Sequence, residues 1–174
     1  MPELQSSTTI YQGRIFDIRV DEIREGDVEY KREVVVHRGS AVIVPLFDDG
    51  TVALVEQYRH AAGKYLLEIP AGSLEKGESP AVCAARELEE EIGFTAAKLE
   101  LIAEFYVSPG FLTEKMYVYL ATGLTETQQN TEIDEIIEVR RIRLSDALEM
   151  TRDGRIQDAK TIIGLIRAES AVRQ

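Results

Sequence analysis

Three glutamates in the segment Pro80–Ile92 have the residue type and spacing of a metal-binding cluster. In an α-helix, at about 100° per residue, Glu87, Glu90 and Glu91 fall within an arc of roughly 100° on one face. Carboxylates this close repel one another, and partial burial raises their pKa values. A divalent cation removes this conflict, and an all-oxygen cluster suits a hard ion such as Mg²⁺ or Mn²⁺. The pattern therefore predicts a Mg²⁺ or Mn²⁺ site on this helix.

An ordinary solvated helix face is the alternative interpretation of a glutamate run, because acidic helix surfaces are common. The residues around the run argue against it. Five residues separate Gly72 from Glu78, seven more separate Glu78 from Arg86, and Gly93 with the apolar Phe94 completes the pattern. Residue frequencies give the full pattern a chance of about one in a million in a chain of this length.

This pattern resembles the Nudix box, written G, five residues, E, seven residues, R-E-U-x-E-E-x-G-U, where U is apolar. The resemblance implies hydrolysis of a nucleoside diphosphate linked to another group. It also implies that the three helix glutamates bind one or more Mg²⁺ or Mn²⁺ ions, with the carbonyl of Ala71 as a further ligand. Arg86 would hold the glutamates through charge-assisted hydrogen bonds, and Glu78 would brace the turn between loop and helix. The box residues are Gly72, Glu78, Arg86, Glu87, Glu90, Glu91 and Gly93.

A second resemblance, to the ADP-ribose pyrophosphatase branch of that family, rests on segments outside the box and runs through most of the chain. These segments are Glu56–Arg59, Leu67–Gly72 and Ser108-Pro109-Gly110, the last followed by Glu114. The resemblance implies that Arg59 contacts the pyrophosphate or the substrate loop. It also implies that Pro109 lies in a substrate-binding element and that Glu114 contacts the terminal ribose side. Without the box, Ser108-Pro109-Gly110 would be interpreted as a tight turn.

That branch takes a general base from a mobile acidic loop, and Glu132, Asp134 and Glu135 occupy the matching region here. Glu135 aligns best with the pattern of the branch. A base on a loop can close over substrate and position water only when it is needed. An ordinary acidic surface loop is the alternative for each of the three, and Glu90 on the helix is the alternative base.

Adenine recognition in that branch uses an N-terminal β domain that is exchanged between the two subunits of a dimer. Phe16, Tyr30 and Arg32 are available here for stacking on the base or for contacts with its edge. Each of the three also has a purely structural interpretation as a strand residue. The resemblance therefore implies a homodimer formed through the N-terminal β element.

Turn signals divide the chain into the elements that must position these residues. Ile15–Val20 and Val28–His37 flank a glycine turn and predict a hairpin, and Ala41–Phe47 with Val52–Tyr58 predicts a second one. The further predicted elements are strands at Tyr65–Ile69, Leu99–Val107, Lys115–Ala121 and Glu135–Ile142, an acidic loop at 125–134, and two helices after Ser145 that are broken near Asp153-Gly154.

This order of strands, one central helix, more strands and terminal helices predicts an α+β fold. The resemblance makes it a Nudix-type α/β/α sandwich of mixed sheet and helices, with a small N-terminal antiparallel β element. Because Arg38-Gly39-Ser40 interrupts the strand pattern, we expect that element at residues 1–38 and the Nudix hydrolase domain at residues 39–174.

The central helix is marked at both ends. Ser79 can cap its N-terminus, Pro80 suits the first helical position, and Gly93 can end it. Cys83, inside the helix, is expected to be a packed residue and not a nucleophile. The face expected to pack into the core consists of Ala81, Ala85, Leu88 and Ile92.

The composition excludes several other classes of protein. The chain has 174 residues, 44% of them hydrophobic and 29% charged, which is ordinary for a globular domain. Its net charge of -11 argues against nonspecific binding to nucleic acid or to an anionic membrane surface. A single cysteine cannot form an internal disulfide, and the polar start and short apolar runs lack the pattern of a signal peptide or a membrane span. We therefore expect a cytoplasmic protein, and the resemblance implies a small-molecule nucleotide-sugar substrate.

The function expected from both resemblances is Mg²⁺-dependent hydrolysis of ADP-ribose to AMP and ribose 5-phosphate. Another nucleotide sugar, such as GDP-mannose or ADP-glucose, is the alternative that keeps the same chemistry. A module that binds a nucleotide metabolite without cleaving it is a further alternative, but such modules usually lose the catalytic carboxylates or carry a DNA-binding domain. Hydrolysis of oxidised nucleoside triphosphates also fits the fold, and Ser108-Pro109-Gly110 argues against it.

Overall fold

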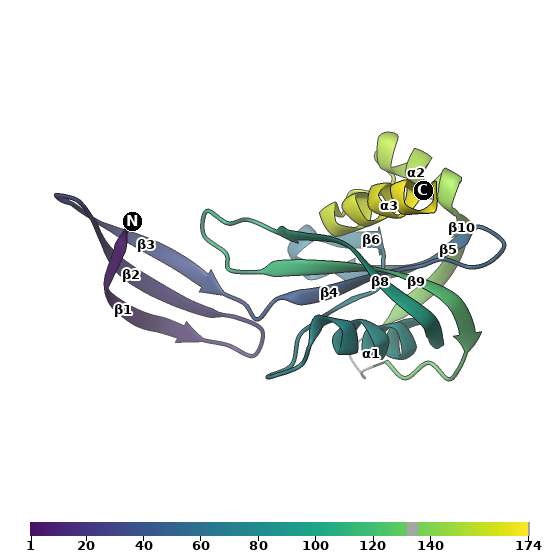
Figure 1. Cartoon of the computed structure of the whole chain (residues 1–174), viewed down its shortest axis with the longest axis horizontal. Helices are drawn as coiled ribbons and strands as arrows, with labels where there is room; N and C mark the ends of the chain where they lie inside the picture. The colour runs from purple at the N-terminus through teal and green to yellow at the C-terminus, as the bar shows by residue number, and fades with distance from the viewer. Residues whose placement is uncertain (132–135, 174) are drawn as a thin grey trace. The chain divides into compact units, whose positions relative to one another are not determined.

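The structure is a computed structural model that describes residues 1–131 and 136–173 (Figure 1). The contacts within it divide the chain into two compact units. The first contains Met1–Gly39 and Phe105–Met116, and the second contains Ser40–Glu104 and Tyr117–Gln174. The first unit thus holds a segment from the middle of the chain in addition to the N-terminal residues. The functional division expected at residue 38 stays a prediction.

The first unit contains a three-stranded antiparallel sheet, ordered β1 (Glu3–Gln12), β2 (Asp17–Glu25) and β3 (Val28–Val36). The first predicted hairpin is confirmed as β2 and β3, which turn at Gly26 with a φ of 61°. Strand β1 was not predicted from the sequence. Every residue of β1 is exposed and most are polar, so the strand carries no alternation of apolar and polar residues to reveal it.

The segment Phe105–Met116 joins this unit through backbone contacts with β3. The amide of Val35 donates to the carbonyl of Phe111 at 2.8 Å, and the amide of Thr113 donates to the carbonyl of Val35 at 3.0 Å. Within the segment, the carbonyl of Ser108 accepts from the amides of Phe111 and Leu112 at 3.2 and 2.9 Å. A hydrogen-bonded turn therefore forms at Ser108-Pro109-Gly110.

The second unit contains two sheets and three helices. One sheet is ordered β10 (Ile137–Arg143), β5 (Thr51–Arg59) and β6 (Lys64–Glu68), with the short 3₁₀ helix η1 (His60–Ala62) between β5 and β6. The other is ordered β7 (Ala71–Ser73), β4 (Ser40–Pro45), β9 (Lys115–Glu126) and β8 (Phe94–Tyr106). Helix α1 (Pro80–Ile92) lies on one side of these sheets, and α2 (Leu144–Arg152) and α3 (Ala159–Val172) lie on the other (Figure 1). The predicted α+β sandwich is confirmed.

The second predicted hairpin is wrong in its pairing. Strands β4 and β5 lie where strands were expected, but they belong to different sheets. The tip of the hairpin remains, with a bridge between Leu46 and Val52 and a hydrogen bond of 2.9 Å from the amide of Phe47 to the carbonyl of Thr51. All of β4 and the residues Val52–Val55 of β5 are buried. Strands buried on both faces are continuous apolar runs without an alternation that would fix their pairing, so the turn between them does not determine the partner.

Helix α1 begins and ends where the sequence predicted. The Ser79 hydroxyl accepts from the amide of Val82 at 3.4 Å, and Gly93 ends the helix in the left-handed conformation with a φ of 72°. The buried face differs from the prediction, because Ala81 and Ala85 are exposed. The buried residues of the helix are Cys83, Ala84, Glu87, Leu88, Glu91 and Ile92. Two of the glutamates thus face inward together with the apolar residues.

The core on the α1 side brings the helix against the central strands. Leu88 and Ala84 pack in one cluster with Ile43 of β4 and Val55 of β5. On the other side, α3 packs closely at Gly164, where a Cβ atom would overlap the side chain of Ile69. The break predicted between the last two helices is confirmed, and Gly154 lies within it with a φ of 82°. Across the described residues, none of the helices has the length and apolar character needed to cross a membrane.

Candidate active site

The carboxylates of α1 lie against the short strand β7. Glu87 and Glu91 are 7% and 4% exposed. The Glu91 Oε2 atom accepts a hydrogen bond from the amide of Ala71 at 3.1 Å. Glu87 lies directly over the backbone of Gly72, where a Cβ atom would overlap its carboxylate. Only glycine at position 72 leaves room for this carboxylate.

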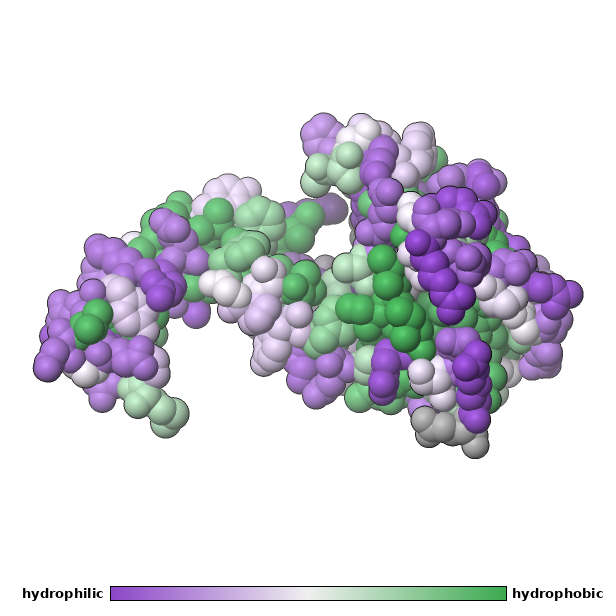
Figure 2. Space-filling view, turned by 90° about the horizontal axis from the view of Figure 1, so that it is seen from above, coloured by the Kyte–Doolittle hydropathy of each residue, from purple (hydrophilic) through white to green (hydrophobic). Residues whose placement is uncertain are grey.

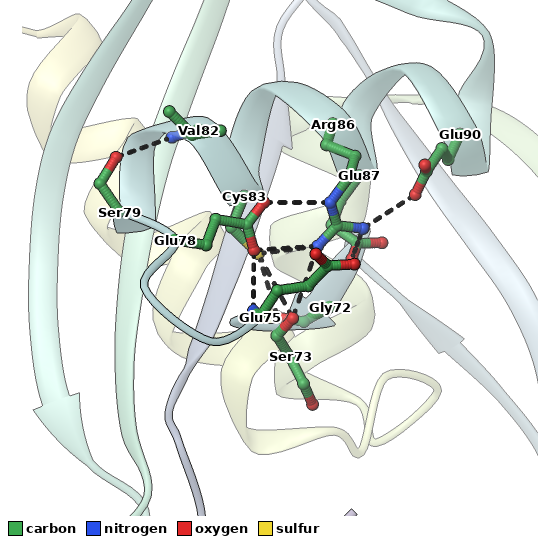
Figure 3. Close-up of polar contacts among 10 residues, drawn as sticks. All are labelled: Gly72, Ser73, Glu75, Glu78, Ser79, Val82, Cys83, Arg86, Glu87 and Glu90. Atoms are coloured by element: carbon green, nitrogen blue, oxygen red, sulfur yellow. Dashed lines mark hydrogen bonds and ion pairs between the residues drawn. The ribbon is translucent and has the colours of Figure 1, made fainter.

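Arg86 contacts three carboxylates at once (Figure 3). Its Nη1 atom donates to Glu87 Oε1 at 2.6 Å and to Glu90 Oε2 at 2.9 Å. Its Nε and Nη2 atoms donate to the two oxygens of Glu78 at 3.1 and 3.2 Å. The hydrogen bonds with Glu78 raise the pKa of Arg86 and lower the pKa of Glu78. Glu78 also accepts from the amide of Glu75 at 2.9 Å, so it joins the loop to the helix.

The oxygen donors of this cluster suit a hard divalent cation in their chemical type. Glu87 and Glu91 are buried carboxylates of one helix that face strand β7, and the Glu87 carboxylate occupies the space that a Cβ atom at position 72 would need. In residues 1–131 and 136–173, no three His, Cys, Asp or Glu side chains converge closely enough to enclose a metal ion. Arg86 accounts for the separation of the carboxylates, because its guanidinium lies between Glu87 and Glu90 and pairs with both. The predicted ligands therefore fit the cation by chemistry, and their role stays a prediction.

Arg59, at the end of β5, is held by a buried carboxylate. Its Nε and Nη2 atoms donate to the two oxygens of Glu68 at 2.8 and 2.7 Å. The Glu68 side chain is 1% exposed, whereas that of Arg59 is 41% exposed. The hydrogen bonds with Glu68 raise the pKa of Arg59 in spite of partial burial, and the charge of Glu91 adds to the effect. Arg59 is therefore fixed by Glu68 and lies within electrostatic range of Glu91 on α1.

The residues that complete this contact were not predicted from the sequence. Lys160 of α3 donates to Glu68 Oε2 and forms an ion pair with Asp158, with 3.0 Å between its Nζ atom and Asp158 Oδ2. Burial opposes ionisation of Glu68, but the hydrogen bonds from Arg59 and the charge of Lys160 outweigh it and lower its pKa. A signal was present in the sequence, since Glu68 is the one charged residue of the apolar run Leu66–Pro70. A lone charge in such a run predicts a buried charge that has a partner elsewhere.

Two predicted substrate-binding residues line one cavity of the first unit. This cavity has a volume of about 550 Å³, and Arg32 and Pro109 are both part of its wall. Asp21 and the ring of Phe111 also line it. Tyr30 lies next to Arg32, whose guanidinium carbon is 4.3 Å from the centre of the Tyr30 ring. The structure thus brings Arg32, Pro109 and Tyr30 into one region.

Phe16 and Glu114 have other neighbours in the first unit. Phe16 packs against Tyr11, with 6.0 Å between the ring centres, and is absent from the cavity wall. Glu114 lies beside His37, with 3.7 Å between its Oε1 atom and the imidazole Nδ1. The glutamate side chain is 15% exposed. The predicted contacts of Phe16 and Glu114 with substrate stay predictions.

The candidate general bases are only partly described. Glu132, Asp134 and Glu135 lie outside the described residues. Glu90, the alternative base, has a side chain that is 38% exposed and pairs with Arg86. The prediction for Cys83 is confirmed in its packing, because the residue is fully buried. Burial raises the pKa of its thiol to about 12, which disfavours the nucleophilic thiolate.

The box spacing and this geometry agree with the comparison to known proteins. Residues 37–163 match the Nudix domain family. The chain is 41% identical over 155 residues to an ADP-ribose pyrophosphatase of Bacillus subtilis (strain 168), covering 87% of this chain and 84% of the relative. It is 38% identical over 173 residues to a methanol dehydrogenase activator of Bacillus methanolicus, covering 95% and 94%.

Two further similarities bear on substrate and fold. The chain is 39% identical over 166 residues to a GDP-mannose pyrophosphatase of Yersinia pestis (strain Pestoides F), covering 88% of this chain and 81% of the relative. A crystal structure of an ADP compounds hydrolase superimposes with a TM-score of 0.86 at 22% identity, covering 99% of this chain and 94% of that one. That likeness shows a shared fold. The family match spans most of the chain and includes the whole box, so this chain belongs to the Nudix family.

Proposed function

We propose that this Nudix hydrolase cleaves the pyrophosphate of ADP-ribose with water, releasing AMP and ribose 5-phosphate. The observation that carries the proposal is the α1 cluster, in which buried Glu87 and Glu91 face the Ala71–Gly72 backbone and Arg86 binds Glu87 and Glu90. The similarity to an ADP-ribose pyrophosphatase over most of both chains supports this choice of substrate.

Glu87, Glu90 and Glu91 would hold Mg²⁺ or Mn²⁺, with the Ala71 carbonyl as a further ligand. Such a cation, when bound, neutralises charge on the pyrophosphate and makes water more acidic. The protein groups have separate tasks around it. Arg86 keeps two of the glutamates in place, and Arg59 offers a cation to the phosphate oxygens.

A general base must take a proton from the attacking water, and the chain offers two candidates for it. Glu135, with Glu132 and Asp134 as neighbours, lies in the acidic segment that matches the branch resemblance. Glu90 lies on α1, next to Arg86. Separate Glu135→Gln and Glu90→Gln variants distinguish them, because loss of the base lowers kcat most and flattens the acid limb of the pH–rate profile.

We also propose a homodimer formed through the first unit. The strand β1 is exposed along its whole length, and β2 and β3 bury little. Figure 2 shows apolar residues, coloured green, among the polar ones on the visible surface of this unit. Exposed apolar side chains there include Leu4, Ile10 and Val28, at 59%, 61% and 61%. A three-stranded sheet with so small a core gains stability from a partner surface.

GDP-mannose is the second candidate substrate, since a relative named GDP-mannose pyrophosphatase is 39% identical to this chain. The chemistry at the α1 cluster would be the same. The two candidates differ in the base and the sugar, which contact residues away from the box.

A hydrolysis screen tests the proposal. The wild-type protein is incubated with ADP-ribose, GDP-mannose, ADP-glucose and nucleoside triphosphates, each with Mg²⁺, with Mn²⁺ and with EDTA. We expect the highest kcat/KM for ADP-ribose and no turnover in EDTA. A higher value for GDP-mannose would transfer the assignment to the second candidate, and no turnover with either metal would reject hydrolysis of all these substrates.

A further inference from the structure

A buried ion network connects three elements beneath Arg59. Glu68, at the end of β6, receives two hydrogen bonds from Arg59 of β5 and one from Lys160 of α3. The side chains of Glu68 and Lys160 are 1% and 10% exposed, so both charges are removed from water. A buried carboxylate of this kind is stable only while its cations remain in place.

The first turn of α3 connects this network to the segment that leads from Glu68 to strand β7. The Thr161 hydroxyl accepts from the amide of Ile69 at 2.9 Å and donates to Asp158 at 2.6 Å. Two residues after Ile69, the amide of Ala71 donates to Glu91. Helix α3 therefore helps to fix Glu68 through Lys160 and the backbone before Ala71 through Thr161.

The orientation of Arg59 depends on which carboxylate it meets. The Nε and Nη2 atoms of Arg59 donate to the two oxygens of Glu68, which makes this contact bidentate. No hydrogen bond from residues 1–131 or 136–173 engages Nη1, and the side chain is 41% exposed. Asp158 is a second negative group near this guanidinium, and Lys160 now neutralises it. Without Lys160, Asp158 would compete with Glu68 for Arg59.

We propose that Lys160 is a positioning residue for Arg59. By pairing with both Glu68 and Asp158, it leaves Glu68 as the acidic partner of Arg59 and so fixes the direction in which the exposed part of the guanidinium faces. Lys160 touches no substrate in this proposal and acts through Glu68. The inference rests on the proposed function in one respect, namely that Arg59 binds the phosphates of the substrate.

A charge-matched pair of variants tests the role of Lys160. Lys160→Met removes the buried cation, and Lys64→Met removes an exposed cation of β6 that contacts Gln157 just before α3. We expect Lys160→Met to lower kcat/KM for ADP-ribose at least about tenfold, mainly through KM. The affinity for AMP in EDTA, measured by calorimetry, should fall with it. Lys64→Met should leave both quantities within about twofold, and Lys160→Arg should recover most of the loss.

A double-mutant cycle separates positioning from general stability. If Lys160 acts through Arg59, Lys160→Met lowers kcat/KM less than about twofold when Arg59 is already Ala. An equal fold-loss in the two backgrounds would overturn the proposal, and so would equal losses in Lys160→Met and Lys64→Met. The melting temperature of each variant is measured at the assay pH, so that kinetics are compared only for folded protein.

Failure of the substrate assignment is a distinct result. If wild-type protein leaves ADP-ribose intact but cleaves another nucleotide sugar, the same cycle is run on that substrate, because every one of them carries a pyrophosphate. Coupling between Lys160 and Arg59 would then support the positioning role while the ADP-ribose assignment fails. Additive losses with an active wild-type enzyme would reject the positioning role and leave the assignment intact.

Discussion

Glu91 has two separable functions at the scale of the single residue. Its Oε2 atom accepts from the amide of Ala71 at 3.1 Å, which joins α1 to β7. The negative charge of its carboxylate is what would bind a cation. A glutamine keeps an acceptor of nearly the same shape and removes the charge, so it separates structure from chemistry.

Glu91→Gln should therefore lower the turnover of ADP-ribose at least about 100-fold with little change in melting temperature. Steady-state hydrolysis and thermal unfolding, measured on the same preparation, check this. Turnover within a few-fold of wild type would remove Glu91 from the proposed metal ligands.

Gly72 permits the close approach of Glu87 to strand β7. A Cβ atom at this position would overlap the end of the Glu87 side chain, which is flexible and can move. Gly72→Ala should consequently displace the carboxylate at small cost in stability and lower kcat at least about tenfold. Normal kcat in a folded Gly72→Ala protein would show that the position of Glu87 has no bearing on turnover.

The loop before α1 and the helix behave as one element because Glu78 and Arg86 connect them. Glu78 is 9% exposed and accepts two hydrogen bonds from Arg86 and one from the amide of Glu75. Its pKa is lowered from 4.5, mainly by the hydrogen bonds from Arg86. A carboxyl with a lowered pKa in the folded state stabilises the protein above its unfolded pKa of about 4.3, and this contribution is lost as the pH falls through the folded value.

Glu78→Gln should thus reduce the free energy of unfolding by about 1–2 kcal/mol at pH 7. The difference from wild type should shrink as the pH falls below the unfolded pKa of about 4.3 toward the lowered pKa of the folded state. Urea unfolding at pH 7, 5 and 3.5 measures it. A difference that stays constant over this range would mean that the charge of Glu78 contributes nothing.

At the scale of the whole molecule, the first unit has an extensive surface and few buried side chains. Asp21 is the one buried residue among β1, β2 and β3, and it pairs with Arg19 and accepts from Ser7. Burial of apolar surface is the main source of stability for a small sheet, so we expect a second chain to cover part of this unit.

Sedimentation at micromolar concentration should therefore give twice the mass of one chain. Replacing Ile10, which is 61% exposed on β1, by arginine should weaken the association, because a charge resists burial in an apolar interface. A monomer for the wild-type protein would contradict the proposed dimer.

The sequence by itself determined the features that depend on neighbours within a few residues. The limits of α1 follow from Ser79, Pro80 and Gly93, and the arc of its glutamates follows from the helical period. The turn at Ser108-Pro109-Gly110 and the break near Asp153-Gly154 are equally local. Hydrogen bonds between close residues form these features, so a local pattern is enough to predict them.

Only the tertiary structure decided what depends on distant partners. It separated β4 from β5, revealed β1 through its pairing with β2, and turned Cys83 and Ala84 of α1 into the core in place of Ala81 and Ala85. It also joined Glu68 to Lys160, which lies 92 residues further along the chain. Packing of whole layers determines such contacts, and the same local sequence is compatible with several packings.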